Sequence, residues 1–492
     1  MNVPVQYLTK SRFLHGSQCS KLLWTSWNAA HLLPAPDQQT LAILEEGKKV
    51  GALARQMFPN GVEISASSFN EAVMDSTLAI QGCRPVFEAT FVYNDCAIRA
   101  DVLTPNDDGS WNLIEVKSTT AVEEIHLQDV AFQLHVLNGA GLRINRCIVA
   151  HINSTFVKHD LIDPHLFFTL ADVTERVSVL RCGIEAEVDR MLRVVRLPEA
   201  PAVRIGRWCD SPHVCPLHDT CWRYLPEQNV TELYRGGDKS FRLLARGVTR
   251  IADIPADVEL TARQAIQHRV AKTGRAYVDK AAIHAFLSQL KYPLSSLDFE
   301  SWNSAIPTLN GARPYAQVCF EYSLHILRSP GAPSEHYVHL AESVDDPRFA
   351  FMRCLRRVLP SDGSVIGFNI SFELARLREC SEVLTEFRPW VDCIQRRALD
   401  LLAIFRSFAF YDARQCGSCS LKAILHPLTS KTYDDLDVRN GTTASTEFLR
   451  VMRGEVGEDE RRRVRRALEE YCSRDTESLL WIISALQKLV AE

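Results

Sequence analysis

The chain reads Asn112-Leu113-Ile114-Glu115-Val116-Lys117, and Asp101 stands fourteen residues before Glu115. The apolar residues around the charges predict a strand, in which alternate side chains share a face. Glu115 and Lys117 would therefore project together, with the Val116 carbonyl beside them. Two carboxylates and a carbonyl suit Mg²⁺ or Mn²⁺, which prefer hard oxygen ligands. A metal that polarises a phosphate, and a lysine that orients the attacking water, indicate phosphodiester cleavage.

Regular elements are expected on both sides of this strand. The apolar spacing predicts alternating strands and helices over residues 84–93, 96–104, 122–139, 146–152 and 170–192. Gln133, on the first of these helices, would support Lys117 or contact the phosphate. Glu88, on the first strand, is a further metal ligand or a carboxylate beside the core. The alternative for the whole set is an edge strand that carries solvated charges.

Cysteines lie at both ends of this region. The four candidates are Cys19, Cys209, Cys215 and Cys221. Close thiolates bind zinc or an iron–sulfur cluster. A zinc site would take His213 or His218 as its fourth ligand, next to the three later cysteines. A 4Fe–4S cluster would instead use Cys19 and tie the two ends of the domain together.

With these pieces, roughly the first 225 residues resemble the RecB/AddB-type PD-(D/E)XK nucleases that carry an iron–sulfur staple, including CRISPR-associated exonucleases. The matching residues are Cys19, Asp101, Glu115-Val116-Lys117, Gln133 and the three later cysteines. The resemblance implies a restriction-endonuclease-like fold, a structural 4Fe–4S cluster, and a metal held by Asp101, Glu115 and Val116. Two positions depart from the family pattern. Gly51 stands where a metal-binding histidine is common, and Leu137 stands where a tyrosine is expected.

A second set of acids begins at residue 298. Asp298 and Glu300 end an apolar strand on one face, and Glu373 lies where a later strand gives way to a helix. Tyr471 and Asp475 are four residues apart and share one face of a helix. Four carboxylates can hold two metals about 3.5–4 Å apart for in-line displacement at phosphorus, with the tyrosine orienting the water. The alternative is a set of solvated charges.

This order of residues resembles the DnaQ-like 3′–5′ exonucleases of the DEDDy type, over about residues 292–492. The resemblance implies an RNase H-like fold and makes the four acids metal ligands. Glu373 stands where the family usually has aspartate, and its extra methylene would move the second metal. The elements expected here are strands over 294–300, 316–327 and 364–368, and helices over 371–384, 446–453, 459–473 and 475–490.

The chain is expected to be an α/β protein of several domains, because 492 residues exceed one ordinary core. The PD-(D/E)XK nuclease would occupy residues 1–225 and the DnaQ-like exonuclease residues 291–492. Residues 226–290 read as short helices. They form either a plain helical linker or an insert that resembles the helix-hairpin-helix elements of some DNA enzymes.

Composition excludes several classes of protein. Hydrophobic residues are 46% and charged residues 24%, as in soluble globular proteins, and the formal net charge is −4. Nucleic acid would therefore need a local basic surface. Fifteen mostly isolated cysteines favour a reducing compartment over a disulfide framework. We expect a cytoplasmic protein, because there is no signal-peptide pattern and no run of roughly 18 apolar residues for a membrane span.

These observations predict a metal-dependent nuclease that cleaves DNA at single strands or ends, in repair or defence, with Mg²⁺ or Mn²⁺ at two sites. DNA is favoured over RNA, and a protein partner in a repair or defence complex is left open. One alternative is a nucleic-acid-binding protein in which one or both folds have lost catalysis, which Gly51 and Leu137 favour for the first domain. Another alternative is an exonuclease that processes RNA.

Overall fold

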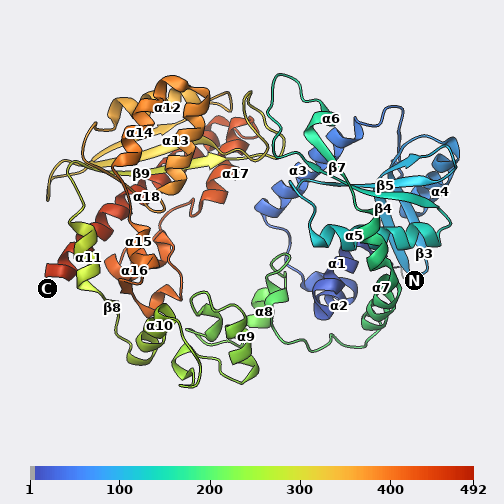
Figure 1. Ribbon diagram of the computed structural model, residues 1–492, viewed down its shortest axis with the longest axis horizontal. Helices are drawn as coiled ribbons and strands as arrows, with labels where there is room; N and C mark the ends of the chain where they lie inside the picture. Colours follow the sequence, from blue (N-terminus) through green and yellow to red (C-terminus); the bar gives the residue numbers. More distant parts are fainter. Residues whose placement is uncertain (1–5, 492) are drawn as a thin grey trace. The chain divides into compact units, whose positions relative to one another are not determined.

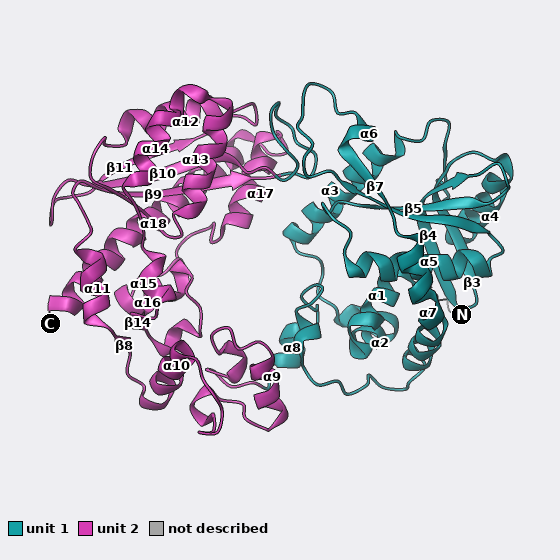
Figure 2. Ribbon diagram, in the orientation of Figure 1, with its two compact units in different colours: residues 1–224, 304–315 teal, residues 225–303, 316–492 magenta. Residues whose placement is uncertain are grey.

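The computed structural model describes residues 6–491 and has a mixed α/β architecture with several sheets (Figure 1). The chain divides into two compact units (Figure 2). The first unit contains residues 1–224 and 304–315, and the second contains residues 225–303 and 316–492. The helical stretch that begins at residue 225 thus belongs to the second unit. Within residues 6–491, no helix combines the length and the apolar character that crossing a membrane requires.

A mixed sheet forms the centre of the first unit, in the order β2-β3-β4-β5-β6-β7, with β1 parallel to β4. Its strands are β1 Leu8–Thr9, β2 Val62–Glu63, β3 Val86–Tyr93, β4 Cys96–Pro105, β5 Trp111–Lys117, β6 Ile144–Ile152 and β7 Phe168–Asp172. β3, β4 and β5 run antiparallel, whereas β5 and β6 are parallel and joined by helix α5, Glu124–Gly139. The strands predicted around the Glu115 motif are confirmed to within a few residues.

Besides α5, seven α-helices belong to the described part of this unit. They are α1 Lys10–Gln18, α2 Ser20–Asn28, α3 Gln38–Arg55, α4 Phe69–Ala79, α6 Pro164–Phe167, α7 Thr174–Val195 and α8 His218–Trp222. The main core lies between the sheet and α1, α5 and α7, where Phe13 stacks on Phe132 at 4.5 Å between ring centroids. A helix start at residue 170 is wrong, because Leu170 and its neighbours pair with β6 as strand β7.

Residues 304–315 belong to the first unit, although in the chain they connect two strands, Leu294–Trp302 and Val318–Leu327, of the second unit. Ala305 packs in one apolar cluster with Val50 of α3 and Phe167 of α6. The Lys158 amide donates a hydrogen bond to the Ala312 carbonyl at 3.0 Å, and the Tyr315 hydroxyl donates to the Ser118 carbonyl. A segment remote in sequence therefore lies next to the end of β5, directly after Lys117.

The second unit is built on a sheet in the order β11-β10-β9-β12-β13. Its strands are β9 Leu294–Trp302, β10 Val318–Leu327, β11 Glu335–Leu340, β12 Ser364–Gly367 and β13 Ala398–Asp400. β9, β10 and β11 are antiparallel neighbours, whereas β9, β12 and β13 run parallel. Helices α12 Arg348–Val358, α13 Ser371–Val383 and α14 Arg388–Arg396 cover one face, and α18 Glu458–Ala491 packs on β9 and β10 (Figure 1).

The remaining elements of this unit are short. They are α9 Asp238–Ala245, α10 Ala262–Thr273, α11 Lys280–Leu287, α15 Leu402–Arg406, α16 Leu421–Thr429, α17 Gly441–Met452, and the paired strands β8 Tyr277–Val278 and β14 Phe410–Tyr411. The expected break between helices over 459–473 and 475–490 is wrong. The backbone stays helical through Arg474, whose guanidinium binds the Asp435 carboxylate at 2.8 and 3.0 Å, and buried residues continue on both sides of it.

Candidate active sites

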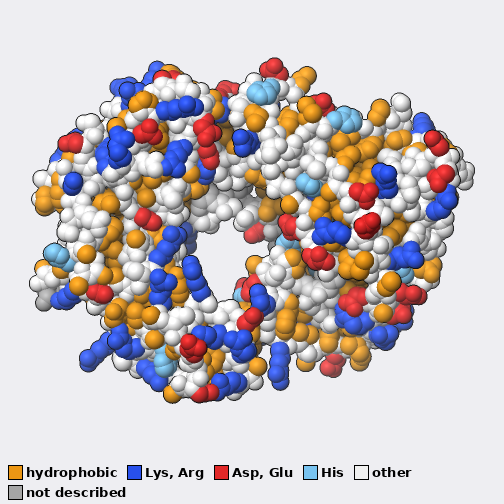
Figure 3. All heavy atoms as spheres, viewed as in Figure 1, with side chains coloured by type: hydrophobic (Ala, Val, Ile, Leu, Met, Phe, Trp, Pro, Cys, Tyr) orange, Lys and Arg blue, Asp and Glu red, His pale blue; other side chains and the backbone are white. Residues whose placement is uncertain are grey.

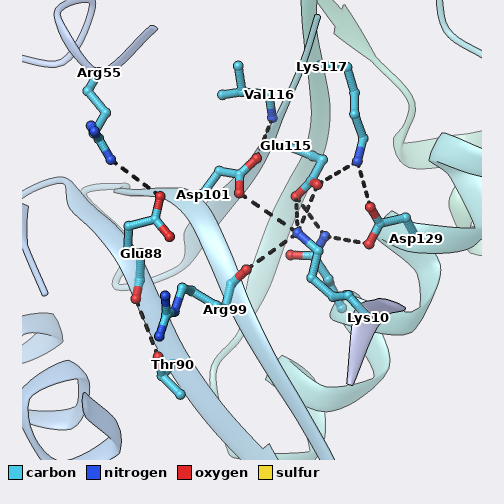
Figure 4. A network of polar contacts seen from close by, with 11 residues as sticks. Lys10, Arg55, Glu88, Thr90, Arg99, Asp101, Glu115, Val116, Lys117 and Asp129 are labelled. Carbon is cyan, nitrogen blue, oxygen red and sulfur yellow. Dashed lines mark hydrogen bonds and ion pairs between the residues drawn. The ribbon is translucent and has the colours of Figure 1, made fainter. Parts of the chain in front are cut away.

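The structure brings together the acids and the lysine predicted for the first site (Figure 4). The Lys117 ammonium lies 2.8 Å from Glu115 Oε1, and the Gln133 amide donates to Glu115 Oε2 at 2.7 Å. Asp101 Oδ2 accepts the Val116 amide proton at 2.8 Å. Two adjacent antiparallel strands and the α5 crossover place these groups, as the alternation along β4 and β5 requires.

Two members of this site have no counterpart in the sequence prediction. Lys10, the first residue of α1, reaches both oxygens of Glu115 at 2.8 and 2.9 Å. Asp129 accepts from Lys117 at 2.7 Å and from Gln133 at 3.0 Å. Asp129 could have been found, because it lies one helical turn before Gln133. Lys10 could not, because only the pairing of β1 with β4 brings it near Asp101.

The electrostatics of this site are dominated by burial and the two ammonium groups. Burial disfavours the charge on Glu115, but Lys10 and Lys117 outweigh it and hold the pKa of that carboxyl well below its usual range. Burial and the Glu115 carboxylate raise the pKa of Asp101 to about 7. Burial raises the pKa of Asp129 as well. Glu115 is therefore the permanent anion of the set.

Of the other residues considered for this site, Glu88 lies on β3 at the register position opposite Asp101 of β4, whereas Gly51 and Leu137 bring no polar group to it. Glu88 has a left-handed backbone, with φ of 58°, and its carboxylate binds Arg55 at 3.3 Å. Gly51 is on α3, where a Cβ would meet no atom within 4 Å. Leu137 is fully buried in the main core. The side chain at position 137 therefore packs in the core, and it does not lie among the polar groups of the site.

The second set of acids also converges, and here the carboxylates face one another. Oxygens of Asp298, Glu300 and Asp475 lie within 4.8 Å of one another. Strand β9 supplies the first two and helix α18 the third. Glu373, at the start of α13, lies outside this trio but is buried, and its Oε2 has no hydrogen-bond partner. An unpartnered buried carboxylate oxygen and a trio of hard oxygen ligands fit a divalent cation.

Burial and mutual repulsion make these carboxyl groups hard to ionise. Burial raises the pKa values of Glu300 and Glu373 to about 8. Burial and the carboxylates around it raise the pKa of Asp298 well above its usual range. Burial also raises the pKa of Asp475 to about 6, although the Tyr433 hydroxyl and Lys422 act in the opposite direction. Such like-charge clusters are typical of functional sites.

Two tyrosines and a lysine border the trio. Tyr471 lies one helical turn before Asp475, as predicted. Tyr433 was not predicted, and its hydroxyl donates to Asp475 Oδ1 at 2.5 Å. The Lys422 ammonium lies 5.1 and 5.4 Å from the centres of the Tyr433 and Tyr471 rings. Asp400 lies at the end of β13, where its Oδ1 accepts the amide protons of residues 369 and 402 and so fixes the chain around that strand.

Tyr433→Phe is expected to lower metal-dependent cleavage by about tenfold, because it removes the donor that orients Asp475. Tyr337→Phe is the matched control, since that hydroxyl binds Glu335 on β11 instead. Steady-state rates at saturating and limiting Mn²⁺ would separate a loss of metal affinity from a loss of turnover. Equal rates for Tyr433→Phe and the parent protein would contradict this role.

The raised pKa of Glu300 predicts a pH-dependent stability of the metal-free protein. The pKa of Glu300 is about 8 in the folded protein and near 4.3 in the unfolded chain. Between these two pH values the carboxyl group therefore holds its proton only in the folded state. The resulting stabilisation is fully present below about pH 4 and is lost as the pH rises to about 8. Glu300→Gln should therefore become more stable relative to the parent between pH 5 and pH 8. Thermal unfolding in EDTA measures this difference, and a constant difference across that range would refute it.

The four candidate cysteines line one pocket of the first unit. Cys19 lies between α1 and α2, and the others come from the loop around α8 and its preceding turn. Cys215 is buried with Leu22, and burial raises its pKa, to which the other three thiols add. The Gln18 side chain donates to the carbonyls of residues 208 and 213, both at 2.7 Å, and so ties the two segments.

The sulfur atoms of this pocket are not arranged as a zinc tetrahedron. Zn–S bonds of about 2.3 Å place neighbouring sulfurs roughly 3.8 Å apart. Within residues 6–491, the acidic trio is the group of three or more potential ligand atoms that all lie within 4.8 Å of one another. No three of the cysteine sulfur atoms therefore lie that close together. His218, a candidate zinc ligand, directs its ring nitrogens to Asp210 at 3.7 Å and Asp219 at 3.4 Å. Lys21 and Arg204 also line the pocket and would balance thiolate charge.

Comparison with known proteins finds similarity over parts of the chain. Residues 295–420 match the profile of a domain of unknown function, DUF2779, and this span contains Asp298, Glu300 and Glu373. The chain is 25% identical over 224 residues to "Uncharacterized protein MG366" of Mycoplasma genitalium, which is 41% of this chain and 33% of the relative. It is 23% identical over 243 residues to "Uncharacterized protein UU173" of Ureaplasma parvum, which is 45% of this chain and 35% of the relative. The chain thus spans about a third of the length of the curated relatives it matches.

Proposed function

We propose that the chain is a metal-dependent nuclease whose principal active site is the acidic trio of the second unit. One observation carries this proposal: Asp298, Glu300 and Asp475 bring carboxylate oxygens within 4.8 Å of one another in a buried place. Buried like charges at this distance are costly unless a cation joins them. Bound Mg²⁺ or Mn²⁺ would polarise the phosphate and lower the pKa of a water.

Residues of the chain itself supply the remaining functions. The Tyr471 hydroxyl would orient the attacking water, and Tyr433 holds Asp475 in place. Lys422 would bind a phosphate of the substrate. On the face shown in Figure 3, basic side chains gather over the region of α15 and α16, to which Arg406 and Lys422 belong. This local positive charge is what a nucleic-acid substrate needs on a chain with a net charge of −4.

The arrangement of strands supports a nuclease fold for each of the two units. Three antiparallel strands followed by parallel β12 and β13, with helices on both faces, suit an RNase H-like domain of the DnaQ type. The antiparallel β3-β4-β5 and the α5 crossover to β6 suit a PD-(D/E)XK domain, with Asp101, Glu115, Lys117 and Gln133 around the strand ends. We propose single strands or ends of DNA as the substrate, and a structural 4Fe–4S cluster on the four cysteines.

Cleavage assays with two variants test this function. Protein purified without oxygen is incubated with matched DNA and RNA strands in Mg²⁺, in Mn²⁺ and in EDTA. Asp298→Asn and Glu115→Gln should each remove one metal-dependent activity. The absence of cleavage of any strand with either metal would refute the proposal, and cleavage of RNA alone would assign the site to RNA processing.

A second function, binding without cleavage, is favoured for the first unit by one observation. Two ammonium groups contact the Glu115 carboxylate, which would otherwise be free to bind metal. Activity that survives Glu115→Gln but not Asp298→Asn, together with unchanged DNA affinity in both variants, would support this function for the first unit.

A further inference from the structure

The Glu115 carboxylate uses all its acceptor positions on groups of the protein. A carboxylate has about four lone-pair sites. Oε1 accepts from Lys10 and Lys117, both at 2.8 Å, and Oε2 accepts from Lys10 at 2.9 Å and Gln133 at 2.7 Å. A metal ion can therefore bind Glu115 only if one of these donors leaves.

Lys10 is the donor that stands in the place of a metal. Its ammonium contacts both oxygens of Glu115, lies 3.8 Å from Asp101 Oδ1, and donates to the Arg99 carbonyl at 3.4 Å (Figure 4). Two carboxylates and a backbone carbonyl around one cation is the ligand set that a hard divalent ion takes. Lys117, in contrast, is shared between Glu115 and Asp129 on the other side.

Rigid elements hold Lys10 in this position. It begins α1, and the side chain of Thr9 caps that helix by accepting the Arg12 amide proton. Leu8 pairs with Cys96 in the sheet, and Phe13 stacks on Phe132 of α5. The Lys10 side chain is only 21% exposed. Its ammonium is therefore directed into the site by the fold itself.

The charge balance differs between the two sites. In the first, the ammonium groups of Lys10 and Lys117 both contact the carboxylate of Glu115, the permanent anion of the set. In the second, the Lys422 ammonium lies 5.1 and 5.4 Å from the centres of the Tyr433 and Tyr471 rings. Among the described residues, no ammonium forms an ion pair with a carboxylate of the trio. Two ammonium groups at the ligand oxygens therefore oppose the approach of a divalent ion at the first site.

We propose that Lys10 is an internal cation that competes with divalent metal for Glu115 and Asp101, so that the first unit binds metal only when the Lys10 ammonium is displaced. This inference rests on the proposed metal site of the first unit. Lys10 lies at this site in addition to Lys117, the lysine predicted from the sequence. Binding of metal is thereby coupled to movement of a side chain at the start of α1.

Mn²⁺ binding measured by the EPR signal of the free ion tests this proposal in the full-length chain. Asp298→Asn with Glu300→Gln removes the trio, so that the first unit is observed. In that background Lys10→Met should bind Mn²⁺ at least about tenfold more tightly, because a like charge within 4–6 Å has been removed. Lys10→Arg retains the charge and should bind as weakly as the parent. Lys48→Met, on the exposed face of α3, is the matched control and should change nothing.

Adding Glu115→Gln to each protein identifies binding at this site, and circular dichroism and thermal melts show that each variant is folded. Equal or weaker Glu115-dependent binding in Lys10→Met overturns the role of Lys10 alone. Absence of Glu115-dependent binding in both Lys10→Met and its parent overturns the metal site, and with it this inference. The function proposed for the trio of the second unit stands under either outcome, because its test is the cleavage assay on the protein with an intact trio.

Discussion

Asp298→Asn is expected to lower metal-dependent cleavage by about a thousandfold, or ~4 kcal/mol of transition-state stabilisation. Asp298 is the first of the three carboxylates whose oxygens lie within 4.8 Å of one another. Asparagine keeps the shape of the side chain but removes the charge that would bind metal. Steady-state cleavage of a labelled single strand measures the change.

The same substitution should stabilise the metal-free protein. Burial and the surrounding carboxylates raise the pKa of Asp298, which means that its ionised form is unfavourable in the folded state. Removing a buried like charge relieves that repulsion, so the melting temperature in EDTA should rise by a few degrees at pH 8. Loss of activity combined with a gain in stability separates an active-site carboxylate from a structural one.

Asp392→Asn is the matched control for both measurements, because Asp392 is an exposed acid on α14. It should leave the rate and the melting temperature unchanged. A destabilised Asp298→Asn protein would show that the carboxylate makes a stabilising contact. Full activity in that variant would remove Asp298 from the active site.

Cys215→Ala is expected to produce a colourless protein with a first unit that melts roughly 10 °C lower. Cys215 is the most buried of the four thiols in the pocket and packs against Leu22 of α2. A cluster on these thiols would join two segments almost two hundred residues apart, and its loss would free both. Absorbance at roughly 400 nm, iron content and thermal unfolding after anaerobic purification measure the effect.

Cys182→Ala is the control for this prediction, because Cys182 is an exposed thiol on α7. His218→Ala distinguishes the two kinds of metal centre. The ring of His218 faces Asp210 and Asp219, so its removal should leave an iron–sulfur cluster in place. A colourless parent protein that contains zinc, and that loses it in His218→Ala, would contradict the cluster.

Local sequence patterns were sufficient for the groups that lie on regular strands and helices. Asp101 and Glu115 could be placed because alternation along a strand fixes the face of every second residue. Tyr471 and Asp475 could be paired because residues four apart share a helical face. The break expected between these two residues was wrong, since Ser473 and Arg474 are weak signals against the tertiary packing of a long helix on a sheet.

The groups that the sequence did not reveal depend on long-range pairing. Lys10 reaches Glu115 because β1 adds to the sheet beside β4. Tyr433 lies in a stretch between α16 and α17 without periodicity, so no pattern directs its hydroxyl to Asp475. No strand or helix was predicted over residues 304–315, and the apolar surface of α3 and α6 explains why Ala305 is buried.

The placement of residues 304–315 has a consequence for synthesis on the ribosome. Residues 304–315 pack on the surface of the first unit around Val50 and Phe167. They are made only after about 90 residues have followed residue 224, where the first part of that unit ends. At about 5–20 residues per second this is a delay of roughly 5–20 s, during which that apolar patch is exposed. By the same reasoning, cutting the chain at residue 225 would leave the N-terminal fragment without Ala305 and Tyr315. Such a fragment should aggregate, and adding a peptide of residues 304–315 should restore its solubility.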